Sequence, residues 1–244
     1  MAGTRTSPPD WQKNARLEGF AGVLDPEDTV GAKNRLIDRA QKRAIAHRIG
    51  ALGGARVLDF GCGVGRLASW LMTKGATVHG VDSSEEMVRQ ARANVPAGEF
   101  DHIGHQFELK DESYDFAFSV GVLGILPADA VGTTLTQLRR ALKPDGKLVA
   151  LEKVSDGTPG RGWTLERYLI SLSAAGLELQ TLDLVRLGYS SVIAAVVRRP
   201  WLSGLPLLPW LLELEAKRHV SKGFADGQYA DYLFVSTPRV VPTG

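Results

Sequence analysis

A glycine-rich loop between an apolar run and a helical segment, within residues 56–66 (RVLDFGCGVGR), constrains the fold more than any other feature. Gly61, Gly63 and Gly65 allow the backbone to turn sharply and to approach a ligand closely, next to the N-terminal amides of the following helix. Beyond this loop, apolar runs of strand length alternate with segments of helical periodicity. Such alternation requires right-handed crossovers, and it predicts a doubly wound, mainly parallel α/β sheet covered on both faces.

The expected elements follow from these periodicities and from turn signals. The last strand, at 229–236, follows a segment that does not look like a simple crossover helix, so this strand can enter the sheet antiparallel to its neighbour. We expect helices at 32–49, 66–73, 84–93, 133–142 and 164–175, earlier strands at 57–60, 77–81, 100–103, 114–123 and 147–154, and a Leu- and Val-rich segment at 177–187.

The chain divides into four segments that we expect to form one domain overall. Residues 1–50 are an N-terminal arm and helix that form a cap, and 51–188 are the ligand-binding core. Residues 189–228 are an apolar insertion on the substrate side, and 229–244 are the last strand and tail. The insertion carries more Trp and Leu than a solvent-exposed loop, which leaves three interpretations: a lid, a permanent cap on the sheet, or a homodimer contact.

The composition is that of an ordinary soluble protein, with 44% hydrophobic and 23% charged residues among 244. A formal net charge of +2 is too small for a protein that coats nucleic acid; we expect no DNA partner, and only the basic helix at 32–49 supports RNA. The lone Cys62 excludes an intrachain disulfide and, with an N-terminus unlike a signal peptide, favours the cytoplasm. Proline and arginine interrupt 192–212, so we expect no membrane span.

Two acids beside the glycine loop indicate the kind of ligand. Asp59, two residues before Gly61, would repel a pyrophosphate but could hold an ammonium group. Asp82 ends the second strand, where a carboxylate can accept hydrogen bonds from both hydroxyls of a ribose. The alternative for Asp82 is to cap the following helix, a role that Ser83 or Ser84 could fill equally well. These residues favour a ligand that carries both an ammonium group and a ribose.

Four segments together resemble the S-adenosylmethionine-dependent methyltransferases of small molecules that have the Rossmann-like seven-stranded fold. The segments lie within residues 56–154, in the order and spacing of that family: VLDFGCGVGRLASWL, VHGVDSSEEMVRQAR, KDESYDFAFSVGVL and LRRALKPDGKLVALEKV. The resemblance implies S-adenosyl-L-methionine as the cofactor, S-adenosyl-L-homocysteine as its product, and an antiparallel last strand.

The resemblance also implies roles for individual residues. Family members often carry an acid after the third strand that contacts the adenine; this chain has Ile103 there, so Asp101 or a backbone amide would substitute. The histidine common after the fourth strand is absent, since the chain reads Leu123, Gly124, Ile125. The implied contacts are Asp59, Gly61, Cys62 and Gly63 to the methionine part, Asp82 and Ser83 to the ribose, and Ser119 and Val120 beside the sulfonium, while Met87 packs either on the adenine or in the core.

Transfer from a sulfonium needs few side chains beyond those that align the acceptor, because the methyl group is already strongly electrophilic. An alcohol acceptor still gains from a general base. Glu152, near the carboxyl end of the fifth strand, is the first candidate, and its alternative is a charge facing water. His219, in the insertion, is the second. No carboxylates stand near Ser119 and Val120 to bind a metal, and none is predicted.

These residues predict methyl transfer to a small molecule, with a hydroxyl oxygen of a sugar or secondary metabolite as the acceptor. The alternatives are C- or N-methylation of a small molecule and then RNA methylation. Two alternatives belong to other classes of protein: a nicotinamide-dependent oxidoreductase and a non-catalytic nucleotide-binding module. Asp59 ahead of the loop argues against the oxidoreductase, and only the completeness of the motif set argues against the binding module.

Overall fold

The computed structural model describes residues 24–104, 107–157, 163–220 and 229–239, and it divides the chain into two compact units. The core unit comprises 51–152, 165–182 and 234–244, and the helical unit comprises 1–50, 153–164 and 183–233. The expected arm at 1–23 and the end of the insertion at 221–228 lie outside the described residues.

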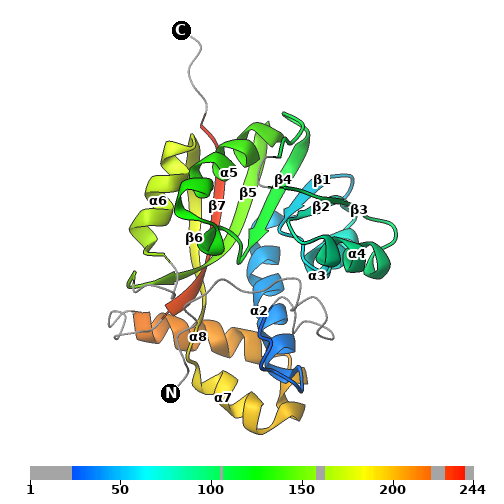
Figure 1. The fold of residues 1–244 in the computed structure, drawn as a ribbon. Helices are drawn as coiled ribbons and strands as arrows, with labels where there is room; N and C mark the ends of the chain where they lie inside the picture. Colours follow the sequence, from blue (N-terminus) through cyan, green and yellow to red (C-terminus); the bar gives the residue numbers. More distant parts are fainter. Residues whose placement is uncertain (1–23, 105–106, 158–162, 221–228, 240–244) are drawn as a thin grey trace. The chain divides into compact units, whose positions relative to one another are not determined.

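The sheet has seven strands in the order β3-β2-β1-β4-β5-β7-β6 (Figure 1). The pairs β1–β2, β1–β4, β2–β3 and β4–β5 are parallel, whereas the last strand, β7, is antiparallel and lies between β5 and β6. This order confirms the predicted fold class. The strands are β1 Arg56–Phe60, β2 Thr77–Asp82, β3 Glu99–His102, β4 Tyr114–Val120, β5 Leu142–Ser155, β6 Leu177–Leu187 and β7 Tyr229–Pro238.

Strand β1 lies between β2 and β4 in the sheet and is buried from Val57 to Phe60. Continuous burial of this kind is typical of a parallel strand covered on both faces, which is why its apolar residues form a run rather than alternate. The helices of the core unit are α3 Arg66–Met72, α4 Glu85–Asn94, α5 Ala128–Ala141 and α6 Leu165–Ala174.

The fourth strand is shorter than the sequence predicts, because β4 ends at Val120 and a 3-10 turn, η1 (Leu123–Ile125), follows it. The backbone amides of Val122 and Leu123 donate to the side chain of Glu152 rather than to a neighbouring strand. A side chain 29 residues further along the chain therefore ends the strand, and local periodicity does not carry that information.

The helical unit brings together two segments far apart in the sequence. Helix α2 (Ala32–Ile49) contacts α7 (Ser191–Arg198), the 3-10 helix η2 (Pro200–Gly204) and α8 (Leu208–Val220). The guanidinium of Arg39 donates to the carbonyl oxygens of Ser203 (2.6 Å) and Leu205 (3.0 Å). In the described part of the chain, no helix is long and apolar enough to cross a bilayer.

Candidate active site

The glycine loop runs from the carboxyl end of β1 to α3, and hydrogen bonds attach it to the carboxyl end of β2. The amides of Gly61 and Cys62 donate to the carbonyl oxygen of Val81, at 2.8 and 3.0 Å. Gly61 has a φ of +73°, and a Cβ on it would lie 2.3 Å from Cγ2 of Val122. The left-handed backbone and the lack of space both require glycine at this position.

Asp82 fixes the loop from the end of β2. Its Oδ2 accepts from the amide of Gly63 and its Oδ1 from that of Ser84, both at 2.9 Å. Burial raises the pKa of Asp82, and these two amides oppose the rise. Each carboxylate oxygen keeps a second lone pair for a ligand hydroxyl. Ser84 is the N-cap of α4, since its Oγ accepts from the amide of Met87 at 3.3 Å; the capping side chain is thus one of the two serines proposed.

Asp59, on β1, is the least satisfied acid beside the loop. Its side chain is buried, and among the described residues its Oδ2 has no hydrogen-bond partner. Burial raises the pKa of Asp59 to about 7; Arg66 lowers it and Asp82 raises it further. A buried carboxylate oxygen without a partner is costly in the free protein. An ammonium group of a ligand would remove that cost, so this residue fits the cofactor that the resemblance implies.

Glu152 holds the loop that follows β4. Its Oε1 accepts from the amides of Val122 (3.1 Å) and Leu123 (3.0 Å), and its Oε2 accepts from Gly124 (3.2 Å). Ser119, fully buried, places its Oγ 3.5 Å from Oε1. Burial raises the pKa of Glu152 to about 7, against the effect of the three amides. With 1% of its surface exposed, Glu152 does not face water, so that alternative is wrong.

Val122 connects the glycine loop with the loop that Glu152 holds. Val122 packs against Gly61 with its methyl groups and donates its amide to Glu152. Sequence reasoning missed Val122, and it also missed Tyr168, whose hydroxyl lies 2.6 Å from the position that a Cβ on Gly124 would take. The glycine at 124 was the available signal for a close neighbour.

The remaining predicted cofactor contacts lie around the same strand ends. Cys62 is buried, which raises the pKa of its thiol, and Met87 is 1% exposed, as expected for core packing. Ser83 is exposed and its carbonyl oxygen lies 3.1 Å from Nε2 of His102. Val120, half-buried, ends β4. Their contacts with a cofactor stay predictions.

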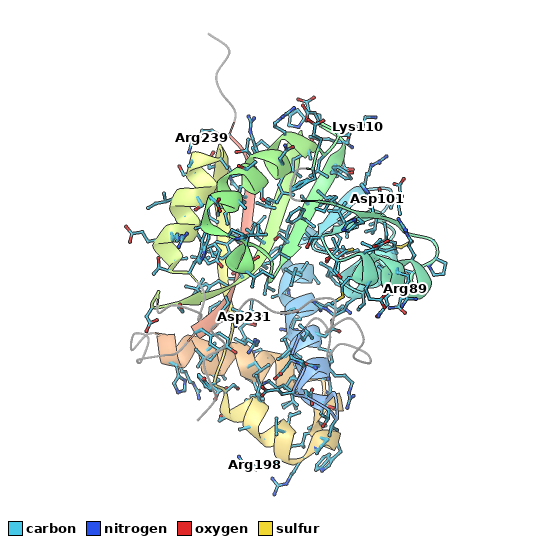
Figure 2. The ribbon with its side chains drawn as sticks, in the orientation of Figure 1. Arg89, Asp101, Lys110, Arg198, Asp231 and Arg239 are labelled. Carbon is cyan, nitrogen blue, oxygen red and sulfur yellow. The ribbon has the colours of Figure 1, made fainter. Side chains whose placement is uncertain are left out.

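Two predicted residues have other partners in the structure. Asp101, labelled in Figure 2, places its Oδ2 3.0 Å from Nε2 of His79. His219 is exposed on α8, where its Nδ1 lies 2.9 Å from the carbonyl oxygen of Glu215. His219 belongs to the helical unit and Glu152 to the core unit, so the two proposed bases are not brought together within one unit.

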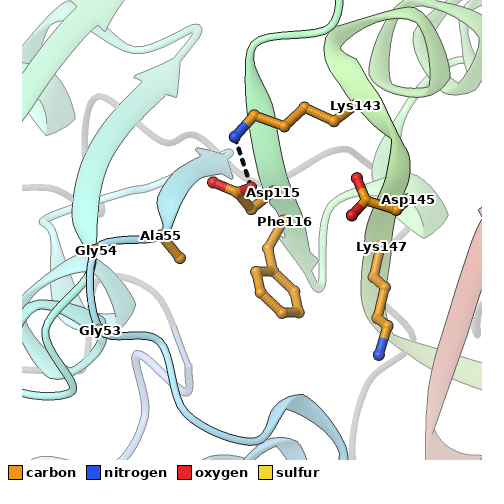
Figure 3. Close-up of a pocket in the computed structure, with 8 residues that line it drawn as sticks. All are labelled: Gly53, Gly54, Ala55, Asp115, Phe116, Lys143, Asp145 and Lys147. Atoms are coloured by element: carbon orange, nitrogen blue, oxygen red, sulfur yellow. Dashed lines mark hydrogen bonds and ion pairs between the residues drawn. The ribbon is translucent and has the colours of Figure 1, made fainter.

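A cavity of about 380 Å³ lies elsewhere in the core unit (Figure 3). Lys143 and Asp115 form an ion pair of 2.6 Å in its wall. The lining residues precede or begin β1, β4 and β5, at the amino ends of these parallel strands. The glycine loop follows the carboxyl end of β1, at the opposite edge of the sheet, so this cavity is separate from the candidate site.

The fold and the loop define a class: a doubly wound α/β domain with a glycine loop at the carboxyl ends of its strands, where Asp59 and Asp82 lie beside the loop. Residues 57–146 match the methyltransferase domain family. This part of the chain is therefore a Rossmann-like, S-adenosylmethionine-dependent methyltransferase domain, which confirms the predicted resemblance and cofactor.

Three known proteins show how far the similarity extends. Methyltransferase GfsG of Streptomyces halstedii is 34% identical over 125 residues, or 47% of this chain and 43% of its own length. The ubiquinone/menaquinone biosynthesis C-methyltransferase UbiE of Citrifermentans bemidjiense is 29% identical over 158 residues, or 58% of this chain and 64% of its own. The chain thus spans less than two thirds of either relative. The crystal structure of the cyclase SpnF has the same fold, with a TM-score of 0.62 at 20% identity, over 83% of this chain and 82% of SpnF.

Proposed function

We propose that the protein transfers a methyl group from S-adenosylmethionine to a small-molecule acceptor, at a hydroxyl oxygen of a sugar or secondary metabolite. The observation that carries the proposal is the buried Oδ2 of Asp59, which has no partner in the described part of the chain and lies beside a loop that Asp82 holds through the amide of Gly63. When bound, S-adenosylmethionine supplies an electrophilic methyl on a sulfonium. Asp59 holds the ammonium group of the cofactor and Asp82 its ribose hydroxyls.

The choice of acceptor rests on the charge of the chain and on the segments outside the matched domain. The small net charge argues against RNA, and acceptor selection falls to segments outside 57–146, chiefly the Trp-rich 189–228. C-methylation is the nearest alternative, because UbiE is a C-methyltransferase. The further proposals are a cytoplasmic location and a homodimer. A cyclase also has this fold, so formation of S-adenosylhomocysteine must be measured directly, in a screen of acceptors with labelled methyl groups.

Cofactor binding by the free protein is the first test. Calorimetry should show micromolar binding of S-adenosylhomocysteine and none of NAD. Asp82→Ala should weaken that binding by about 30-fold, or ~2 kcal/mol, since it deletes charge-assisted hydrogen bonds to the ribose. Asp129→Asn, a change of an exposed carboxylate on α5, is the control and should leave the affinity unchanged. Binding of NAD in place of S-adenosylhomocysteine would overturn the assignment.

We propose that Glu152 is a positioning residue that holds the loop at 122–124, while its role as general base stays a prediction. The folded protein keeps the proton of Glu152 up to a pH of about 7, whereas the unfolded chain releases it near 4.5. The contribution of this group to stability is therefore full below about pH 4.5 and is lost as pH rises through 7, by on the order of 3 kcal/mol.

Glu152→Gln removes this dependence. Relative to wild type, its free energy of unfolding should rise between pH 5 and pH 8 in urea titrations, while Glu166→Gln, at an exposed site, should not change the profile. The same variant separates the two roles: weaker binding of S-adenosylhomocysteine indicates positioning. Unchanged binding with a lower kcat, and loss of the rise in rate near pH 7, would indicate a base.

A further inference from the structure

The segment from the end of α7 to the start of α8 exposes an unusual amount of apolar surface. Trp201 is 72% exposed, Val197 57%, Leu207 51%, Trp210 50% and Leu205 38%. We call these five side chains the η2 surface. Isolated exposed apolar residues are normal in soluble proteins, but two tryptophans and three aliphatic residues within one short segment mark an interaction site.

The charged side chains between the residues of the η2 surface are positive. The nearest acids along the chain, Asp183 and Glu213, already pair with Arg48 and Lys217. Arg198 and Arg199 are exposed between its residues, and Figure 2 labels Arg198 at the end of α7. No Asp or Glu occurs from 184 to 212. Arg39 binds the carbonyl oxygens of Ser203 and Leu205, which attaches η2 to α2, a helix with six lysines and arginines against a single acid.

We propose that the η2 surface docks the protein on an anionic lipid bilayer. Tryptophan and leucine favour the boundary between headgroups and acyl chains, and arginines at the same level bind lipid phosphates. This combination accounts for both the apolar and the cationic residues. The near-neutral charge of the whole chain does not oppose it, because surface binding depends on local charge within a Debye length.

A second copy of the chain fits the η2 surface less well. A two-fold contact would place the same patch on both subunits, so Arg198 and Arg199 of each copy would meet a patch of the same sign. Glu213, the nearest acid after the patch, already pairs with Lys217. The like charges would oppose the contact, whereas an anionic bilayer supplies the complementary sign.

The test is co-sedimentation of the full chain with phosphatidylcholine vesicles that either contain or lack phosphatidylglycerol. The wild type should bind the anionic vesicles, and binding should weaken as salt is added. Trp201→Ala/Trp210→Ala and Arg198→Gln/Arg199→Gln should each reduce binding by about tenfold or more. All four sites are exposed, so the variants should keep the circular dichroism spectrum and the Tm of the wild type.

Matched controls come from exposed residues of the core unit. Ile170→Ala removes an apolar side chain that is 61% exposed, and Arg89→Gln/Lys110→Gln removes two exposed positive charges; neither should change vesicle binding. Failure of the wild type to bind anionic vesicles would overturn the proposal. So would a dimer in analytical ultracentrifugation that Trp201→Ala/Trp210→Ala converts to monomer. Neither vesicle binding nor the oligomeric state depends on methyl transfer, so these experiments test the docking proposal independently of the proposed function.

Discussion

Asp59→Asn should weaken binding of S-adenosylhomocysteine by about 100-fold at pH 7.5, the largest effect expected from a single change in the site. The substitution keeps the shape of the side chain but removes the buried charge that pairs with the ammonium group of the ligand. Breaking a buried charge pair by removal of one partner costs about 3 kcal/mol or more. Isothermal titration calorimetry of the wild type and the variant measures the difference.

The pH dependence of binding gives this prediction a second readout. In the free protein Asp59 has a pKa of about 7, and it must lose its proton to pair with an ammonium group. The affinity of the wild type should therefore increase by about tenfold from pH 5.5 to pH 7, with release of a proton on binding. In Asp59→Asn the affinity should not vary over that range. Equal affinities at both pH values in the wild type would show that Asp59 does not contact the ammonium group.

The sequence predicted the glycine loop and its acids because each depends on a few consecutive residues. One strand ends in glycines and a second ends at Asp82, and the carboxyl ends of parallel strands lie at the same edge of the sheet independently of the other segments. The contacts of Glu152 depend instead on a loop about 30 positions earlier in the chain. Its place at a strand end was predictable, but its three amide partners and its burial were not.

The helical unit shows the same limit on a larger scale. Helical periodicity predicted α2, and an apolar composition marked the segment after residue 188 as unlike a crossover helix. The contacts of α2 with α7, η2 and α8 join segments separated by about 150 residues, and no local pattern links them. Arg39 is one of six lysines and arginines on α2, and its contacts with two carbonyl oxygens of the η2 region do not follow from the sequence of that helix.

Gly61→Ala should lower the free energy of unfolding by about 2–5 kcal/mol. A side chain at a φ of +73° costs about 1–2 kcal/mol, and its Cβ would overlap Cγ2 of Val122 at 2.3 Å, which adds about 1–3 kcal/mol of overpacking. Relief of the overlap would move Val122, and with it the loop that Glu152 holds. Binding of S-adenosylhomocysteine should therefore weaken together with stability, as measured by urea denaturation and calorimetry.

Adding Val122→Ala to Gly61→Ala separates the cost of the left-handed backbone from the cost of overpacking. It removes Cγ2 and Cγ1 and leaves the Cβ of residue 122 at 3.3 Å from the new methyl group, a tight but tolerable contact. The double variant should recover the overpacking share, about 1–3 kcal/mol, and keep the backbone share. Gly132→Ala is the matched control, since this helical glycine has open space around it and the change should stabilise α5 by up to about 1 kcal/mol. If Val122→Ala restores nothing, the close approach of the two loops is not what requires glycine at position 61, and the left-handed backbone alone sets the cost.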